Sequence, residues 1–296
     1  MDIGLFVPLS TFNANAAFLR ALGPAVEERG FESVWLPEHV VLFENYQSSY
    51  PYSPDGKMPG GADTGVLEPL MALSYVAAVT DNVKLGTAIC LIPQRNPVYT
   101  AKQVADLDLL SGGRAVLGIG IGWLREEFEA LNVPFAQRGQ RTDEYLQVIK
   151  SLWTEETSSF AGDFYSLPAC RMYPKPVQSP HPPVVVGGES RAAMRRAARY
   201  GQGWFSFNRL PEECPPAFED LDAELVDVGR SRKDPDFSVS VCPYFQPVSA
   251  RSIEEYHAAG VDRLVVVCLG FTPDDLLPTL DQLVKDVLEP ARAVSS

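Results

Sequence analysis

The sequence has few of the residues that build metal sites or disulfide frameworks. Its 296 residues include three histidines and five cysteines, and no two cysteines form a C-x-x-C pair. The histidines lie far apart at positions 39, 181 and 257, so no metal-ligand spacing is visible and no metal site is expected. An odd, scattered set of thiols is typical of a reduced, cytoplasmic protein.

Basic residues and long apolar runs are also scarce. The chain has 25 Lys and Arg against 38 Asp and Glu, a net charge of −13. So acidic a surface repels phosphate backbones, and we expect no nucleic-acid partner. No apolar run reaches the ~20 residues that span a bilayer, so no membrane contact is expected. The first residues, MDIGLFVPL, lack the basic segment and cleavage site of a secretory signal, which again favours the cytoplasm.

What the chain does have is a regular alternation of strand-like and helix-like segments. Eight strand-like segments are expected at 2–8, 33–39, 83–89, 114–120, 183–188, 203–207, 237–245 and 263–269, each followed by helical sequence. Residues 183–186 and 264–268 are continuous aliphatic runs, which is typical of parallel strands buried on both faces. The pattern predicts an α/β fold, a (β/α)8 TIM barrel, formed by one domain over residues 1–296. A doubly wound sheet is the alternative.

Two segments interrupt this alternation, one after the second strand and one before the fifth. Residues 40–66 are rich in Tyr, Ser, Pro and Gly, and a long loop of this kind is usually functional or mobile. Its aromatic rings suggest either a lid over the substrate or an arm that contacts a second subunit. Residues 160–182 contain five prolines and are expected to form a rigid inserted arm or hairpin.

A glycine-rich stretch, GGRAVLGIGIGWLREEF (112–128), ends the fourth strand. Its G-x-G-x-G spacing places Trp123 where a dinucleotide fingerprint has its third glycine, so a Rossmann site is poorly supported. In a barrel, function lies at the carboxyl ends of the strands. Glycines gather there at strands four and five, whereas Glu38 and His39 follow strand two. We therefore expect a phosphate-bearing ligand over the glycines and chemistry near His39.

Several blocks of the sequence resemble one known family. They are VWLPEH (34–39), the long block from Lys84 to Trp123, FAQRGQRTDEYLQVIKSLWT (135–154), and the segment 160–205, which contains PVVVGGES. Together they resemble the luciferase-like monooxygenase superfamily, whose TIM-barrel enzymes bind FMN or the deazaflavin F420. The resemblance covers nearly the whole chain except the last ~60 residues. Gln202 stands where the family commonly has Asp. The P-E-H ending and the P-D-G loop are more similar to the F420-dependent branch, and FMN remains the alternative cofactor.

The resemblance implies a cofactor ring across the barrel mouth. It places a cis peptide bond at Ala88–Ile89 under that ring, and Glu126 where relatives have a cofactor-contacting side chain; a charge at a helix start is the other interpretation of Glu126. Glu189 would repel a phosphate unless its side chain turns away. The implied cofactor-binding residues are Ala88, Ile89, Cys90, Gly120, Ile121, Gly122, Trp123, Glu126, Gly187, Gly188 and Ser190.

His39 is the expected catalytic residue, because histidine side chains titrate near neutral pH and exchange protons readily. Glu38 either orients His39, hydrogen-bonds the edge of the cofactor ring, or is a solvated carboxylate. The leading hypothesis is an F420-dependent oxidoreductase that transfers a hydride between the reduced deazaflavin and a small organic substrate. The alternatives are an FMN-dependent monooxygenase that activates O₂ and a non-catalytic flavin-binding relative. The resemblance also implies a homodimer, in which the helices after strands two and three face the partner.

Overall fold

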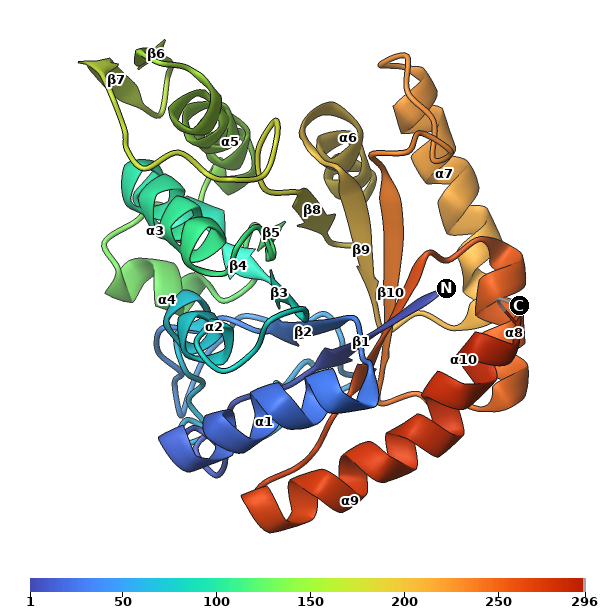
Figure 1. Cartoon of the computed structure of the whole chain (residues 1–296). Helices are drawn as coiled ribbons and strands as arrows, with labels where there is room; N and C mark the ends of the chain where they lie inside the picture. Colours follow the sequence, from blue (N-terminus) through green and yellow to red (C-terminus); the bar gives the residue numbers. More distant parts are fainter. Residues whose placement is uncertain (295–296) are drawn as a thin grey trace.

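The computed structural model describes residues 1–294, and within them eight parallel strands close into a barrel (Figure 1). Barrel strands that are successive along the chain are also neighbours in the barrel. β3 pairs with β2 on one side and with β5 on the other, and β5 pairs with β8, so the ring is closed. This confirms the (β/α)8 TIM barrel. The barrel strands are β1 (Asp2–Phe6), β2 (Ser33–Leu36), β3 (Lys84–Thr87), β5 (Ala115–Gly120), β8 (Val184–Gly187), β9 (Gly203–Phe207), β10 (Ser238–Tyr244) and β11 (Arg263–Val267).

Helices cover the outside of the barrel (Figure 1). They are α1 (Ala16–Arg29), α2 (Pro69–Ala77), α3 (Pro97–Leu110), α5 (Arg138–Thr154), α6 (Arg191–Tyr200), α7 (Cys214–Val226), α8 (Ala250–Ala259), α9 (Pro273–Leu283) and α10 (Glu289–Val294), with a π-helical turn at Val284–Leu288. Local sequence sets their ends. Asn15 accepts a hydrogen bond from the Phe18 N–H and starts α1, and Gly30, at φ 80°, ends it. No helix in residues 1–294 combines the length and apolarity needed to cross a membrane.

The smaller elements lie in the connections. They are β4 (Cys90–Leu91), the 3₁₀ turns Ile92–Gln94 and Pro211–Glu213, α4 (Arg125–Ala130), and the antiparallel pair β6 (Ser158–Ala161) and β7 (Ser166–Cys170). The β6–β7 pair begins just before the predicted insertion at 160–182 and gives it the expected hairpin. The 40–66 segment is irregular, apart from an isolated bridge between Ser10 and Val66. The second insertion therefore has regular structure, and the first is a loop.

The barrel interior explains some of the glycines in the strands. Trp35 is fully buried inside the barrel with Phe205, their ring centroids 5.3 Å apart. A Cβ atom at Gly86 would lie 2.4 Å from the Trp35 ring, and one at Gly118 would lie 1.9 Å from the Thr87 carbonyl oxygen. Real Cβ atoms do not come that close. Gly118, part of the glycine-rich stretch, therefore serves the packing of the barrel.

Candidate active site

A cavity of about 560 Å³ opens at the carboxyl ends of the strands. Several of the predicted site residues line it: Glu38, His39, Ala88, Ile89, Ile121, Gly122, Trp123, Gly187 and Gly188. The remaining four, Cys90, Gly120, Glu126 and Ser190, are not part of its wall. The structure thus brings residues from β2, β3, β5 and β8 to one place, as the positions of function in a barrel require.

His39, in the loop after β2, is held by a carboxylate that the sequence reasoning missed. Its Nδ1 lies 3.1 Å from Oε2 of Glu127, which is fully buried on α4. The Glu127 carboxylate also accepts hydrogen bonds from the Val40 N–H (2.6 Å) and from Nε2 of Gln94 (3.1 Å). Because a carboxylate only accepts, Nδ1 of His39 carries a proton and donates it to Glu127. Nε2 is therefore the nitrogen left to exchange a proton with a ligand.

The surroundings of Glu127 favour its ionised form despite its burial. Burial alone would raise its pKa, but the hydrogen bonds and charge of His39, Gln94 and the Val40 N–H outweigh burial and lower it. The imidazole of His39 therefore rests against a fixed negative charge. The expectation that Glu38 orients His39 is wrong, because Glu127 occupies that position.

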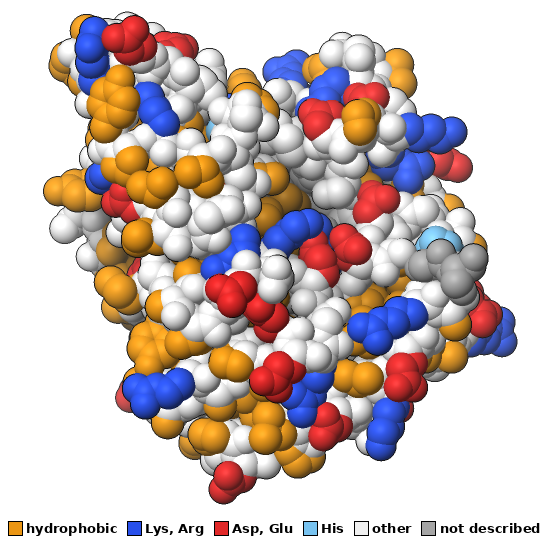
Figure 2. All heavy atoms as spheres, in the orientation of Figure 1, with side chains coloured by type: hydrophobic (Ala, Val, Ile, Leu, Met, Phe, Trp, Pro, Cys, Tyr) orange, Lys and Arg blue, Asp and Glu red, His pale blue; other side chains and the backbone are white. Residues whose placement is uncertain are grey.

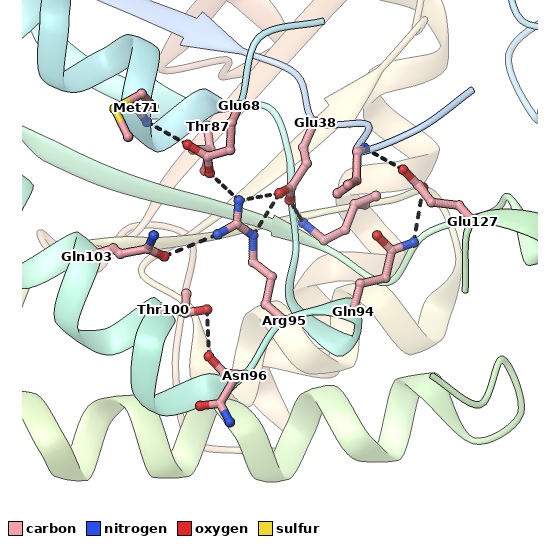
Figure 3. A network of polar contacts seen from close by, with 12 residues as sticks. Glu38, Glu68, Met71, Thr87, Gln94, Arg95, Asn96, Thr100, Gln103 and Glu127 are labelled. Carbon is pink, nitrogen blue, oxygen red and sulfur yellow. Dashed lines mark hydrogen bonds and ion pairs between the residues drawn. The ribbon is translucent and has the colours of Figure 1, made fainter. Parts of the chain in front are cut away.

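Glu38 instead braces the chain after β3. Its carboxylate accepts hydrogen bonds from Nε of Arg95 (2.7 Å) and from the Leu91 N–H, and Arg95 also pairs with Glu68 (Figure 3). Glu38 is nearly completely buried, so its charge needs this partner. The Arg95 bridge ties the end of β2 to the start of α2 and fixes the segment that follows the third strand.

The end of β3 carries the backbone feature that the resemblance implied. The Ala88–Ile89 peptide bond is cis. Glycines from two neighbouring strands make room for Ile89: a Cβ atom at Gly120 would lie 1.8 Å from its Cδ1 atom, and one at Gly187 would lie 3.0 Å from its Cγ2 atom. Gly120 therefore lies under Ile89, and Ile89 itself faces the cavity.

The corner after β5 combines a bare backbone with positive charge. Gly122 has φ +76°, and a Cβ atom there would lie 2.8 Å from the Phe128 ring. Its carbonyl oxygen accepts a hydrogen bond from Nε of Arg138 (3.0 Å). The guanidinium groups of Arg138 and Arg125 lie 3.9 and 4.3 Å from the centre of the Phe135 ring, and in residues 1–294 neither has a carboxylate partner. Both cations remain available to an anionic group.

The corner after β8 leads into a helix N-terminus. Gly188 has φ +120°, and Ser190 caps α6 by accepting a hydrogen bond from the Ala193 N–H (3.3 Å). The first N–H groups of a helix have no intrahelical partner and attract anions. Glu189 turns toward β9, where it accepts a hydrogen bond from the Phe207 N–H (2.8 Å) and pairs with Arg209. The charge of Glu189 is therefore compensated by Arg209. Its side chain points toward β9, which is the condition under which it would not repel a phosphate at the start of α6.

Glu126 holds the loop after β2 and is not part of the cavity wall. Its carboxylate accepts hydrogen bonds from the Gln47 N–H (2.6 Å) and the Ser48 hydroxyl (2.7 Å), and the Arg125 N–H donates to that hydroxyl (3.0 Å). Glu126 therefore anchors this loop, and its contact with a cofactor stays a prediction. Residues further along the loop, from Tyr50 to Val66, line the cavity.

Residues 1–273 match the family described as luciferase-like monooxygenase. The chain belongs to this family. It is 31% identical to an uncharacterised protein of Mycobacterium tuberculosis (strain H37Rv), covering 92% of this chain and 84% of that one. It is 31% identical to the F420-dependent glucose-6-phosphate dehydrogenase of Kineococcus radiotolerans, covering 77% and 64%. The FMNH(2)-dependent dimethylsulfone monooxygenase of Pseudomonas putida is 34% identical, covering 53% and 44%.

A solved F420-dependent secondary alcohol dehydrogenase, in complex with an F420-acetone adduct, has the same fold. Its TM-score is 0.76 at 17% identity, and the match covers 98% of each chain. The luciferase-like family comprises flavin- and F420-dependent oxidoreductases and monooxygenases, and this chain is an enzyme of that class.

The cavity fits the cofactors of the luciferase-like family. A ring can lie on the Ile89 surface, and the corners at Gly122 and Gly188 leave space that a side chain would fill. Arg138 and the N-terminus of α6 supply positive charge for a phosphate. Sequence reasoning missed Arg138 as it missed Glu127, since no motif distinguishes either residue from its charged neighbours.

Proposed function

We propose that this enzyme is an F420-dependent oxidoreductase, which transfers a hydride between the deazaflavin and a small organic substrate. The observation that carries the proposal is the hydrogen bond between His39, which lines the cavity, and Glu127, which is buried behind it. A hydride that reaches a carbonyl carbon leaves an oxygen that needs a proton, and His39 is placed to supply it. The sequence similarity to an F420-dependent dehydrogenase supports the same cofactor.

The residues of this chain would bind the cofactor, orient the substrate and exchange a proton with the substrate oxygen. Ile89 and the corners at Gly122 and Gly188 would hold the cofactor, which supplies or accepts the hydride when bound. In the oxidising direction, Nε2 of His39 takes the proton from the substrate hydroxyl as the hydride leaves the carbon that bears this hydroxyl. A carbonyl group forms. Glu127 stabilises the resulting imidazolium. In the reducing direction, the imidazolium returns this proton to the oxygen.

An FMN-dependent monooxygenase that activates O₂ is the second candidate, supported by the FMNH(2)-dependent relative. Titration of the purified protein with F420 and with FMN, followed by ring fluorescence, separates the two. We expect saturable binding of F420 and binding of FMN that is at least tenfold weaker. Binding of FMN without binding of F420 would overturn the first proposal.

We also propose that the enzyme is a cytoplasmic homodimer. Large apolar side chains on α2 and α3 are exposed: Met71 (74%), Tyr99 (72%) and Leu110 (76%). Figure 2 shows apolar side chains on the side of the molecule where Figure 1 places these helices. Exposed apolar surface of this kind often marks an interface. The five cysteines are free thiols, which supports a reducing compartment.

A further inference from the structure

One wall of the cavity is built from aromatic rings that come from four separate segments. We call these residues the aromatic box: Phe6 of β1, Tyr50 and Tyr52 of the 40–66 loop, Phe207 of β9 and Tyr244 of β10. Phe207 is at its centre, with ring centroids 5.7 Å from Phe6, 4.8 Å from Tyr52 and 4.5 Å from Tyr244. Tyr50 continues the box to Trp123, 5.2 Å away.

The cations near the cavity, Arg125 and Arg138, lie at the corner after β5, where the phosphate of the cofactor is expected, and not among the side chains that line the cavity. Of the residues between 1 and 294 that line it, none is a lysine or arginine, and Glu38 is the only carboxylate. Glu38 is already paired with Arg95. A phosphate or carboxylate on the substrate would lose its hydration beside the box without gaining a partner, which is costly. An uncharged molecule avoids this cost.

The aromatic box also contains hydrogen-bonding groups, the hydroxyls of Tyr50 and Tyr244. The Tyr50 and Tyr244 hydroxyls share a hydrogen bond, and because only one of their two protons lies in it, the other is left for a ligand. Burial raises the pKa of Tyr50 and of Tyr244, so both remain neutral donors.

The backbone at Tyr244 is unusual in a way that aims its ring. Tyr244 has φ +57°, a conformation that is rare for an aromatic residue, and the pairing of β10 with β11 shifts register between Val241 and Tyr244. Such irregularities re-aim a side chain and are frequent beside active sites. Here the ring joins the cavity wall.

We propose that the aromatic box selects an uncharged, largely apolar substrate with a carbonyl or hydroxyl oxygen, and that the Tyr244 hydroxyl donates a hydrogen bond to this molecule. Tyr244 is thus a specificity-determining residue. The inference rests on the proposed function in taking a small organic molecule as the substrate. It deepens that proposal by excluding sugar phosphates and other anions.

The test is calorimetric titration of the full-length protein, without cofactor, with two molecules of matched shape. One is 4-tert-butylcyclohexanone and the other is its methylene analogue, in which C=CH₂ replaces C=O. We expect the wild type to bind the ketone more tightly, and Tyr244→Phe to weaken ketone binding about five- to twentyfold while leaving the alkene unchanged. Tyr50→Phe/Tyr244→Phe should abolish the preference for the ketone. Tyr145→Phe, whose ring packs on Tyr165 outside the cavity, is the control and should behave as wild type.

Each outcome decides one question. An unchanged ratio of ketone to alkene affinity in Tyr244→Phe overturns the inference, as does binding of neither molecule. Binding of glucose 6-phosphate as tight as that of the ketone overturns it too. Because no cofactor is present, a retained preference for the ketone in a protein that fails to bind F420 would remove the proposed function and leave this inference standing.

Discussion

His39 and Glu127 are 88 positions apart in the sequence, yet Nδ1 of His39 lies 3.1 Å from Oε2 of Glu127. The first follows β2 and the second lies on α4, so only the closed barrel brings them together. The buried carboxylate fixes the imidazole with Nδ1 as the donor. It therefore sets which nitrogen faces the reaction.

Replacing Glu127 by Gln should slow turnover by about 10- to 100-fold, a part of what general acid–base catalysis contributes. The amide keeps the size of the side chain but removes the charge that stabilises the imidazolium. Steady-state kinetics should show the loss in kcat, with F420 affinity unchanged. Glu129→Gln, an exposed position on the same helix, is the matched control. A double variant with His39→Ala should be no slower than His39→Ala alone, and fully additive losses would contradict the coupling.

Gly122→Ala should weaken F420 binding and lower the free energy of unfolding by about 2–4 kcal/mol. A positive φ costs an alanine about 1–2 kcal/mol, and the new Cβ atom would also meet the Phe128 ring. Gly112→Ala separates these two causes, because Gly112 has φ +69° and open space around it. Urea denaturation should show a loss of about 1 kcal/mol there, with unchanged F420 affinity. Equal losses in the two variants would argue against the crowded corner.

The sequence was sufficient for the barrel but only partly for the site. Continuous apolar strands specify a buried parallel sheet, and the glycine pattern pointed to a corner that lines the cavity. The sequence could not show that the two glycines have different roles. Gly120 lies under Ile89, whereas Gly122 lines the cavity. Nor could it choose between Glu126 and Glu127. Consecutive residues on a helix point about 100° apart, so Glu126 reaches the 40–66 loop and Glu127 reaches His39. Which of the two faces His39 depends on how α4 is rotated about its axis when it packs.

Glu126→Ala should loosen the loop that walls the cavity. The change removes the acceptor of the hydrogen bonds from Gln47 and Ser48, so the loop opens more often. We expect faster limited proteolysis within residues 43–61 and a higher KM for the substrate. Glu129→Ala should leave both unchanged. If the proteolysis rate of Glu126→Ala matches that of the wild type, Glu126 is not the anchor of the loop.

Leu110→Arg should convert the proposed homodimer to monomers. A cation on an apolar interface is costly when it becomes buried without a partner. Val226→Arg is the matched control, since Val226 is similarly exposed (71%) but lies on α7. Sedimentation equilibrium should show a mass near 65 kDa, about twice the 32.5 kDa of one chain, for the wild type and Val226→Arg alone. A wild-type protein that sediments as a monomer would contradict the proposal.

At the opposite end of the barrel, Glu32 provides a test of stability against pH. Its carboxylate binds Nε and Nη2 of Arg263, each at 2.8 Å, and Nζ of Lys84 at 2.7 Å. Burial would raise the pKa of Glu32, but these cations outweigh burial and lower it from 4.5 to about 2. A lowered pKa means that the ionised form stabilises the fold above the unfolded-state pKa, and a shift of this size corresponds to about 3 kcal/mol.

Glu32→Gln should therefore reduce the free energy of unfolding by about 3 kcal/mol at pH 7. The difference from the wild type should shrink as the pH falls from 4.5 toward 2, because protonation makes the wild-type side chain as neutral as glutamine. Urea denaturation across this range measures it, with the exposed Glu28→Gln as the control. A difference that stays constant from pH 7 to pH 3 would show that Glu32 acts through packing and not through its charge.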